Sequence, residues 1–387
     1  MSDWERSDDE LLATLQDLVA IESVNPGLPG GGRGEVGMVD YLHRFFSDLG
    51  LSCETPEVLP GRSNFIATLE GENADKVTVF ECHMDTASVE VMSIPPYEPH
   101  IRDGLMYGRG SCDTKAGGVA MMHAMKRFVD AGRKPANTVV YAGAVDEEYL
   151  MRGADHLAAH LNADAAVIAE PTDLEVIRAH KGVLRFTIAV KGVAAHSSKP
   201  YLGVNAISKM ARLITCLEEE LSPLYEGRDF ELLGSPTFSI GIIEGGMQVN
   251  FVPDLCRIAV DVRTIPGLTG DEFLQEFRDV VERAKAADDG LEAEVEATTH
   301  ACAPLGTTAD ARLVQRAAAA CDEVVGSAVV SGVPYGTDAS FFAGSGVPSI
   351  VLGPGSIDQA HGAVEWVECA QVPKAVDIYH RIMEAGV

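Results

Sequence analysis

Five residues of types that bind metal ions lie far apart in this chain, and at least four of them follow apolar, β-branched segments. They are His83, Asp113, Glu148, Glu170 and His361. In an open α/β sheet, ligands bind in the crevice outside the carboxyl ends of the strands, so residues at several strand ends can converge on one site. Two imidazoles and three carboxylates suit a pair of divalent metal ions that share one bridging carboxylate. This combination favours a hydrolase.

Two short motifs supply candidates for catalysis beside the ligands. His83 and Asp85 stand two positions apart on a strand, so their side chains share a face and the Asp85 carboxylate can orient the His83 ring. Asp146, Glu147 and Glu148 follow another buried strand and repel one another unless cations or solvent hold them. We expect Glu148 to bind metal and Glu147 to act as general base toward a metal-bound water. Taken singly, a surface turn and an acidic loop explain these motifs better.

The other three ligands come from loop motifs. Asp113 stands in the segment GRGSCDTKAGG at an expected helix start, where glycines allow close approach and the helix dipole stabilises a carboxylate. Glu170 precedes Pro171, which ends its strand. His361 closes the glycine loop GPGSIDQAH. Each motif alone has a structural explanation, such as an N-cap for Asp113, but their common place on one α/β pattern favours a shared site.

Composition and charge exclude several classes of protein. The formal net charge of −28 argues against nucleic acid and anionic membrane surfaces as partners. The chain starts with an acidic segment that lacks an apolar h-region, so no signal peptide is expected. Apolar residues at a 3.6-residue spacing predict an amphipathic helix over residues 8–21. No segment reaches the ~18 apolar residues that span a bilayer. The eight cysteines form no paired framework, as expected of reduced thiols in a cytoplasmic protein.

The length of 387 residues and the order of the elements predict two domains. Strands and helices alternate over residues 1–180 and again over 297–387, which predicts an α/β catalytic domain with a doubly wound, largely parallel sheet. Residues 181–296 follow the order β-α-β-β-α-β and predict an inserted ferredoxin-like α+β domain. A second copy of the chain can cover the edge strands of the insert, so a homodimer through this domain is expected.

Eight motifs in a fixed order carry a resemblance to a known family. They are HMDT, GRGSCDTKAGG, DEE, EPT followed by RAHKG, AHSSKPYLGVNAI, GGMQVNFVPD, DVRTIPG and GPGSIDQAH. Together they resemble the acetylornithine deacetylase/succinyl-diaminopimelate desuccinylase family, which are co-catalytic zinc amidohydrolases related to aminoacylases and glutamate carboxypeptidases. The likeness spans nearly the whole chain, and it implies that the insert is a lid and dimerisation domain.

The resemblance implies a division of labour among the ligands. It assigns them to two zinc ions: His83, Asp113 and Glu170 to one, and Asp113, Glu148 and His361 to the other. Cobalt and manganese ions also tolerate these ligands. Glu147 would be the base and later the acid, and Asp85 would orient the first histidine.

The resemblance also implies site residues in or beside the insert. His196 resembles the histidine that the family lends across a dimer to the tetrahedral oxyanion. Asn250 and Arg263 resemble the pair that grips the substrate α-carboxylate, for which the bidentate fork of arginine is suited. Gly336 and Thr337 are expected to line the pocket for the acyl group or the amino acid.

The expected reaction is the hydrolysis of the amide bond of a small N-acyl amino acid. The segment RAHKG resembles the acetylornithine deacetylase branch, since desuccinylases tend to carry arginines where His180 and Lys181 stand. Desuccinylase, dipeptidase and carboxypeptidase activities remain alternatives of the same chemistry, and a non-catalytic binding protein is an alternative of another class. After His361 the chain reads Gly-Ala-Val-Glu-Trp where the family often has Pro-Asp-Glu or Asn-Glu, which leaves the contacts beside this histidine open.

Overall fold

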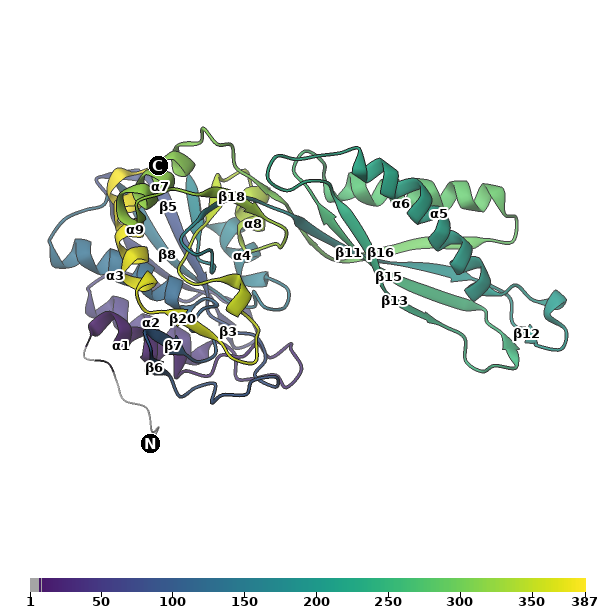
Figure 1. Cartoon of the computed structure of the whole chain (residues 1–387), viewed down its shortest axis with the longest axis horizontal. Helices are drawn as coiled ribbons and strands as arrows, with labels where there is room; N and C mark the ends of the chain where they lie inside the picture. Colours follow the sequence, from purple (N-terminus) through teal and green to yellow (C-terminus); the bar gives the residue numbers. More distant parts are fainter. Residues whose placement is uncertain (1–6, 8) are drawn as a thin grey trace. The chain divides into compact units, whose positions relative to one another are not determined.

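The computed structural model describes residue 7 and residues 9–387, and it divides into two compact units (Figure 1). Unit 1 holds the chain up to Arg178, together with Gly306–Gly332 and Thr337–Val387. Unit 2 holds Ala179–Leu305 and Val333–Gly336. Among the described residues, no helix combines the length and the apolarity that crossing a membrane requires.

Unit 1 is built on a mixed sheet whose four central strands run parallel. In spatial order these are β8 (Asn137–Ala144), β5 (Asn73–His83), β9 (Ala165–Ile168) and β19 (Ser349–Val351). Their neighbours β4 and β10 run antiparallel to β8 and β19. The outer strands are β1 (Ser52–Glu54), β4 (Phe65–Leu69), β10 (Val176–His180), β17 (Leu305–Gly306) and β18 (Val330–Val333). The sheet is therefore mixed, and its parallel part is confined to the centre.

Helices cover both faces of this sheet (Figure 1). One face carries α1 (Glu10–Val19), α2 (Val36–Asp48), α3 (Lys115–Asp130), α7 (Arg312–Val325) and α9 (Gln371–Ala385), and the other carries α4 (Arg152–His160) and α8 (Ala339–Gly344). The predicted helix over 8–21 is α1, and residue 8 lies outside the described residues. Asp9 caps it by accepting hydrogen bonds from two main-chain N–H groups.

Along β5, apolar side chains and potential metal-binding side chains alternate between the two faces of the sheet. Phe80 and Cys82 belong to the large apolar core on the α3 and α9 side. Because side chains alternate along a strand, Glu81 and His83 point to the opposite face. Strand β5 lies between β8 and β9, which follow it in the chain through α3 and α4. The ends of these three strands thus form a topological switch point, where α/β folds bind ligands.

Smaller sheets in unit 1 fix two loops beside this point. Strand β20 (Trp366–Glu368) pairs antiparallel with β7 (Leu105–Tyr107), which also pairs with β6 (His100–Arg102). The Gly108 N–H donates to the carbonyl oxygen of Glu365 over 3.1 Å. The remaining short pair is β2 (Glu57–Leu59) with β3 (Arg62–Ser63).

Unit 2 follows the order β-α-β-β-α-β. Its antiparallel sheet has the spatial order β13 (Thr237–Gly245), β15 (Leu255–Thr264), β11 (Gly182–Lys191) and β16 (Glu292–Cys302). Helices α5 (Ala206–Glu226) and α6 (Gly270–Ala287) lie on one face of it, and Thr269 with Glu272 forms a capping box at the start of α6 (Figure 1). Beyond the β13 end, a small pair joins β12 (Ala195–His196) to β14 (Phe251–Val252), next to the short helix η1 (Pro200–Leu202).

Candidate metal centre

The central parallel strands of unit 1 bring most of the predicted ligands to one edge of the sheet. His83 is the last residue of β5, Glu148 follows β8 and Glu170 follows β9. His361 lies in the loop after β19, next to the short helix η2 (Ile357–Gln359). Asp113 precedes α3, the helix that leaves the β5 end. All five predicted ligands meet here in two groups of three that share Asp113.

The first group consists of buried side chains. His83, Asp113 and Glu170 are only 2%, 6% and 5% exposed, and one donor atom from each lies within 4.8 Å of the others. His83 Nε2 stands 3.0 Å from Asp113 Oδ1 and 4.0 Å from Glu170 Oε1. Burial raises the pKa of Glu170 well above its ordinary value, and the neighbouring Asp113 charge adds to this effect.

The second group contains the other carboxylate oxygen of Asp113, Oδ2, together with Glu148 and the more exposed His361. His361 Nε2 lies 3.2 Å from Asp113 Oδ2 and 2.9 Å from Glu148 Oε2. Burial opposes the charged form of Asp113, but hydrogen bonds from His361 and His83 outweigh it and hold the pKa of this carboxyl below its usual range. Asp113 is therefore an anion between two imidazoles.

The donor set and its spacing fit two divalent ions. Ligand atoms about 2.0–2.2 Å from a tetrahedral zinc ion stand about 3.3–3.6 Å apart, and the 2.9 and 4.0 Å separations above bracket this range. Glu148 Oε1 is buried and has no hydrogen-bond partner among the described residues. A cation would satisfy that oxygen, since a buried polar atom otherwise costs free energy.

Asp85 contacts both the ring of His83 and the turn that carries Glu147. His83 Nδ1 lies 2.9 Å from the main-chain oxygen of Asp85 and 3.8 Å from its carboxylate. Because a carbonyl only accepts, Nδ1 carries a proton, and a metal ion would take the place of the Nε2 proton that is shared with Asp113. The Asp85 carboxylate instead accepts the main-chain N–H groups of Glu147 and Glu148, both over 3.1 Å, and the Asn25 amide over 2.6 Å. It thereby fixes the turn that carries the predicted base.

The surroundings of Glu147 raise the pKa of its carboxyl group, which suits a general acid and base. Its side chain is partly buried. Removal from water raises its pKa well above the ordinary value; His83 opposes this shift, and the charges of Asp338 and Glu148 add to it. A carboxyl with a raised pKa can both take and return a proton near neutral pH.

Asp146, the first of the three consecutive carboxylates, belongs to a separate network. Its oxygens accept hydrogen bonds from Arg62 over 3.0 Å, from Arg152 over 2.5 Å and from Asn25 over 3.1 Å. Burial opposes the charged form, but these partners hold its pKa below the usual range. Hence the repulsion that we expected among three neighbouring carboxylates is limited to Glu147 and Glu148.

Sequence reasoning missed the residues that hold the ligands in place. Asn25 and Arg62 lie in N-terminal segments that carry no catalytic motif, and Arg109 and Glu365 pair across 256 positions of the chain. The only signals were that Arg109 stands inside the glycine-rich motif and that Glu365 follows His361 closely. Neither is specific enough to name a partner.

Comparison with known proteins agrees with this geometry. Residues 79–385 match the sequence profile of peptidase family M20/M25/M40. The chain belongs to this family. It is accordingly a hydrolytic enzyme of the metallopeptidase and amidohydrolase type.

Individual M20-family relatives match nearly the whole chain. An acetylornithine deacetylase of Vibrio campbellii is 31% identical over 380 residues, which cover 96% of this chain and 97% of the relative. Another, of Proteus mirabilis, is 30% identical over 378 residues, which cover 95% of each chain. Among solved structures, aminopeptidase PepT of Bacillus cereus has a TM-score of 0.80 at 22% identity and 98% coverage of both chains. The YXEP protein of Bacillus subtilis, a dinuclear metal-binding peptidase, has a TM-score of 0.71 at 18% identity, with 97% and 98% covered. The structural likenesses establish a shared fold.

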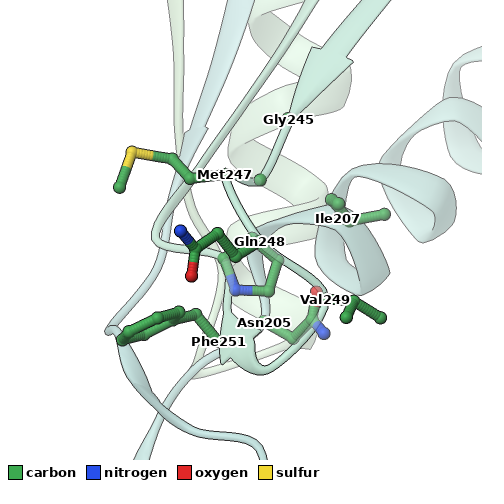
Figure 2. A pocket seen from close by; sticks show the side chains of 9 residues that line it. Asn205, Ile207, Gly245, Met247, Gln248, Val249 and Phe251 are labelled. Atoms are coloured by element: carbon green, nitrogen blue, oxygen red, sulfur yellow. The ribbon is translucent and has the colours of Figure 1, made fainter.

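Unit 2 of this M20-family chain brings two of its predicted site residues together. Strands β12 and β14 pair His196 with Phe251, and the Ser197 N–H donates to the Asn250 carbonyl over 3.0 Å. The loop between β13 and β14, which contains Met247, is exposed to solvent, and the exposed fraction of Met247 is 93%. The hollow beside it has a volume of about 450 Å³, and Figure 2 shows the side chains along its edge. They come from Asn205, Ile207, Gly245, Gly246, Met247, Gln248, Val249, Phe251 and Pro253.

Arg263 lies elsewhere in unit 2, which changes the expected pairing with Asn250. It stands near the last residue of β15, whereas the Asn250 loop precedes the first residue of this strand, Leu255. At about 3.3 Å per residue the two lie roughly 25 Å apart. One carboxylate therefore cannot contact both residues of the same chain. Their action as a pair stays a prediction, and the extended strand between them means that such a pair would come from two copies of the chain. Arg263 Nε donates to Asp261 over 2.8 Å.

The two predicted pocket residues have different surroundings. Thr337 is buried, and its hydroxyl accepts the N–H of Ala339 over 3.2 Å at the start of α8. Gly336 belongs to unit 2, where an added Cβ would stand 3.4 Å from the Lys181 carbonyl oxygen and 3.6 Å from Cys302 Sγ. Thr337 thus has a local structural role, and contact with substrate stays a prediction for both.

We expect metal binding to release protons and to tighten as the pH rises. In the metal-free protein, hydrogen bonds to Asp113 and Glu148 raise the pKa of His361 to about 11. The imidazole is protonated at neutral pH, and a metal ion must displace that proton. The dissociation constant should therefore fall roughly tenfold per pH unit for each proton released. Chelator competition with Zn²⁺ at pH 6, 7 and 8 measures this, and a constant affinity across that range would contradict it.

Proposed function

We propose that this chain hydrolyses the amide bond of an N-acyl amino acid and prefers substrates like those of acetylornithine deacetylase. We propose that the reaction uses two divalent metal ions, and that these ions are zinc. The observation that carries the proposal is the pair of three-ligand groups sharing Asp113, with Glu147 on the adjoining turn. Deacetylase relatives about 30% identical over nearly the full length support the substrate class. Bound ions would supply Lewis acidity toward the amide carbonyl and lower the pKa of water.

Glu147 supplies the proton transfers in this proposal. Its carboxylate takes a proton from the attacking water and returns it to the leaving amine. The raised pKa of Glu147 suits the second step, because it favours the protonated form that returns the proton. The hydrogen bond from its main-chain N–H to Asp85 keeps the side chain on the turn beside the ligands.

We propose that the enzyme works as a homodimer joined through unit 2. Strand β13 is an edge of the four-stranded sheet, and its Ile242 and Ile243 are more than half exposed. Exposed apolar edge strands favour pairing with a second copy. Exposed Tyr201 and Val249 extend the apolar surface toward the β12–β14 pair.

The separation within unit 2 supports the same proposal. Since Asn250 and Arg263 of one chain are too far apart to share a carboxylate, a dimer in which each copy contributes one of them resolves the conflict. His196 would come with Asn250 from the partner copy. Its Nδ1 accepts the Ser198 N–H over 3.1 Å, so the neutral ring carries its proton on Nε2. That N–H is a donor suited to a developing oxyanion.

Mixing two inactive variants tests the action of His196 in trans. His196→Ala and Glu147→Ala homodimers should each be nearly inactive. A mixed dimer joins an intact His196 from one copy to an intact Glu147 in the other, so one of its two sites is complete and activity should return to a quarter of the wild-type value or somewhat less. The measurement is turnover after subunit exchange, with exchange proven by native mass spectrometry. Proven exchange without recovery would refute action in trans.

A substrate panel tests the proposed reaction. We expect the highest kcat/KM for N-acetylornithine or a similar short N-acyl amino acid, and lower values for N-succinyl-diaminopimelate and for dipeptides. Assays with the Zn²⁺-, Co²⁺- and Mn²⁺-loaded enzyme identify the preferred ion. A preference for dipeptides would instead make the chain a peptidase of the same chemistry, and an enzyme that binds two ions yet cleaves no amide would refute the proposal.

A further inference from the structure

A fully buried carboxylate of unit 1 lies between the two loops that carry Asp113 and His361, two of the three ligands of the second group. Glu365 is 0% exposed, and its two oxygens accept four hydrogen bonds. Oε1 accepts the N–H groups of Cys112 and Asp113 over 2.9 and 3.0 Å, and Oε2 accepts the Gly110 N–H over 3.1 Å. Three main-chain donors of the turn that ends in the shared ligand thus converge on one side chain.

The fourth donor is a buried arginine. Arg109 is 1% exposed and donates from Nη1 to Glu365 Oε2 over 2.6 Å. Its Nη2 donates to the main-chain oxygens of Ser88 over 2.8 Å and Gly362 over 3.5 Å. Gly362 directly follows His361, so the arginine also reaches the loop of the exposed ligand. Breaking one partner of a buried ion pair leaves an uncompensated charge, so the two residues depend on each other.

These contacts connect Asp113 and His361 independently of any metal ion. Glu365 accepts a hydrogen bond from the main-chain N–H of Asp113. Glu365 also ends the loop that begins at His361, and its ion pair with Arg109 fixes that end of the loop. A further contact crosses between the two segments, where Cys112 Sγ donates to the Ser356 carbonyl over 3.3 Å. The His361 side chain is 59% exposed, so packing restrains it much less than it restrains His83. The ends of its loop must then define its position.

We propose that Glu365, together with Arg109, is a positioning residue that sets the distance between Asp113 and His361 before metal binds. The proposal rests on the dinuclear function proposed above and goes further by assigning the preorganisation of the second ligand group to this one buried pair. Partners that orient metal ligands typically change metal affinity 10–100-fold when they are mutated.

The chemistry of the site makes Glu365→Gln a sharp test. A carboxylate offers about four lone-pair positions, and all four contacts are present here. Glutamine has nearly the same volume, but its amide nitrogen would face two N–H donors instead of accepting from them. We expect the metal-free variant to stay folded and to bind one of its two Zn²⁺ ions 10–100-fold more weakly, as measured by chelator competition and metal analysis. Hydrogen exchange of metal-free protein should also be faster in the peptides that hold Gly110, Cys112 and Asp113.

A matched control separates positioning from general stabilisation. Glu276→Gln removes the same charge from an ion pair of unit 2, where Glu276 Oε1 lies 2.6 Å from Arg228 Nη2. It should lower the melting temperature of the metal-free protein without changing either dissociation constant. Equal affinity of Glu365→Gln and wild type for both ions would overturn the inference, as would an equal loss of affinity in the control.

Two further outcomes keep the test decisive. Should Glu365→Gln not fold, Arg109→Lys serves instead, because it retains the charge and loses the fork that joins Glu365 to Gly362; a folded Arg109→Lys protein with unchanged affinities would overturn the inference. A wild-type protein that binds fewer than two ions would contradict the proposed function itself, which distinguishes that failure from this one.

Discussion

Replacing Glu147 by glutamine is expected to lower kcat by about 10²- to 10⁴-fold, the usual contribution of a general acid–base residue. The reason is that the amide neither takes a proton from water nor returns one to the leaving amine. Because Glu147 belongs to neither three-ligand group, both metal ions should stay bound. Steady-state kinetics with metal analysis of the same sample checks both halves of this expectation.

Metal analysis of the two glutamine variants distinguishes the role of Glu147 as a base from the role of Glu148 as a ligand. Glu148→Gln should lose metal, because Glu148 Oε2 belongs to the second ligand group. Near-normal turnover by Glu147→Gln would refute the assigned role. Loss of a metal ion from that variant would instead mean that Glu147 is a ligand, contrary to the geometry.

Replacing the shared carboxylate Asp113 by asparagine is expected to have an equally large effect for a different reason. A neutral amide has one oxygen where the carboxylate presents one to each histidine, at 3.0 and 3.2 Å. The variant should retain fewer than two ions after dialysis, and kcat/KM should fall by about 10³-fold, the value of several kcal/mol of lost Lewis-acid stabilisation. Elemental analysis and kinetics with added Zn²⁺ measure both quantities.

Asp338→Asn is the matched control for this substitution. Asp338 is buried in the same unit, and burial raises its pKa well above the ordinary value, with the Glu81 carboxyl adding to the shift. It belongs to neither ligand group. This variant should keep both ions, so a loss of metal in both variants would point to general damage and argue against a specific role of Asp113.

The convergence of the ligands was predictable because it follows from strand direction. His83, Glu148 and Glu170 each stand at or just after the end of an apolar segment, and parallel neighbours place such ends at one edge. The extent of the parallel region was less predictable. Strand β4, with the sequence FIATL, is as apolar as the central strands, and only its pairing with β8 makes it antiparallel.

The residues that hold the ligands were not predictable, since their partners lie far away in the chain. The contacts of Glu365 with Arg109 depend on the register of β20 against β7, and the neutralisation of Asp146 depends on Arg62 from another segment. No local periodicity reports such contacts.

The sequence by itself determined the ligand types, their place at strand ends and the candidate base, because these depend on local pattern and on the chirality of α/β connections. Only the tertiary structure decided that Asp113 stands between both histidines, that Asp85 holds the Glu147 turn, and that Asn250 and Arg263 of one chain lie at opposite ends of a sheet. The physical reason is that distances across a fold are set by strand register and loop closure, which involve residues far apart in the chain.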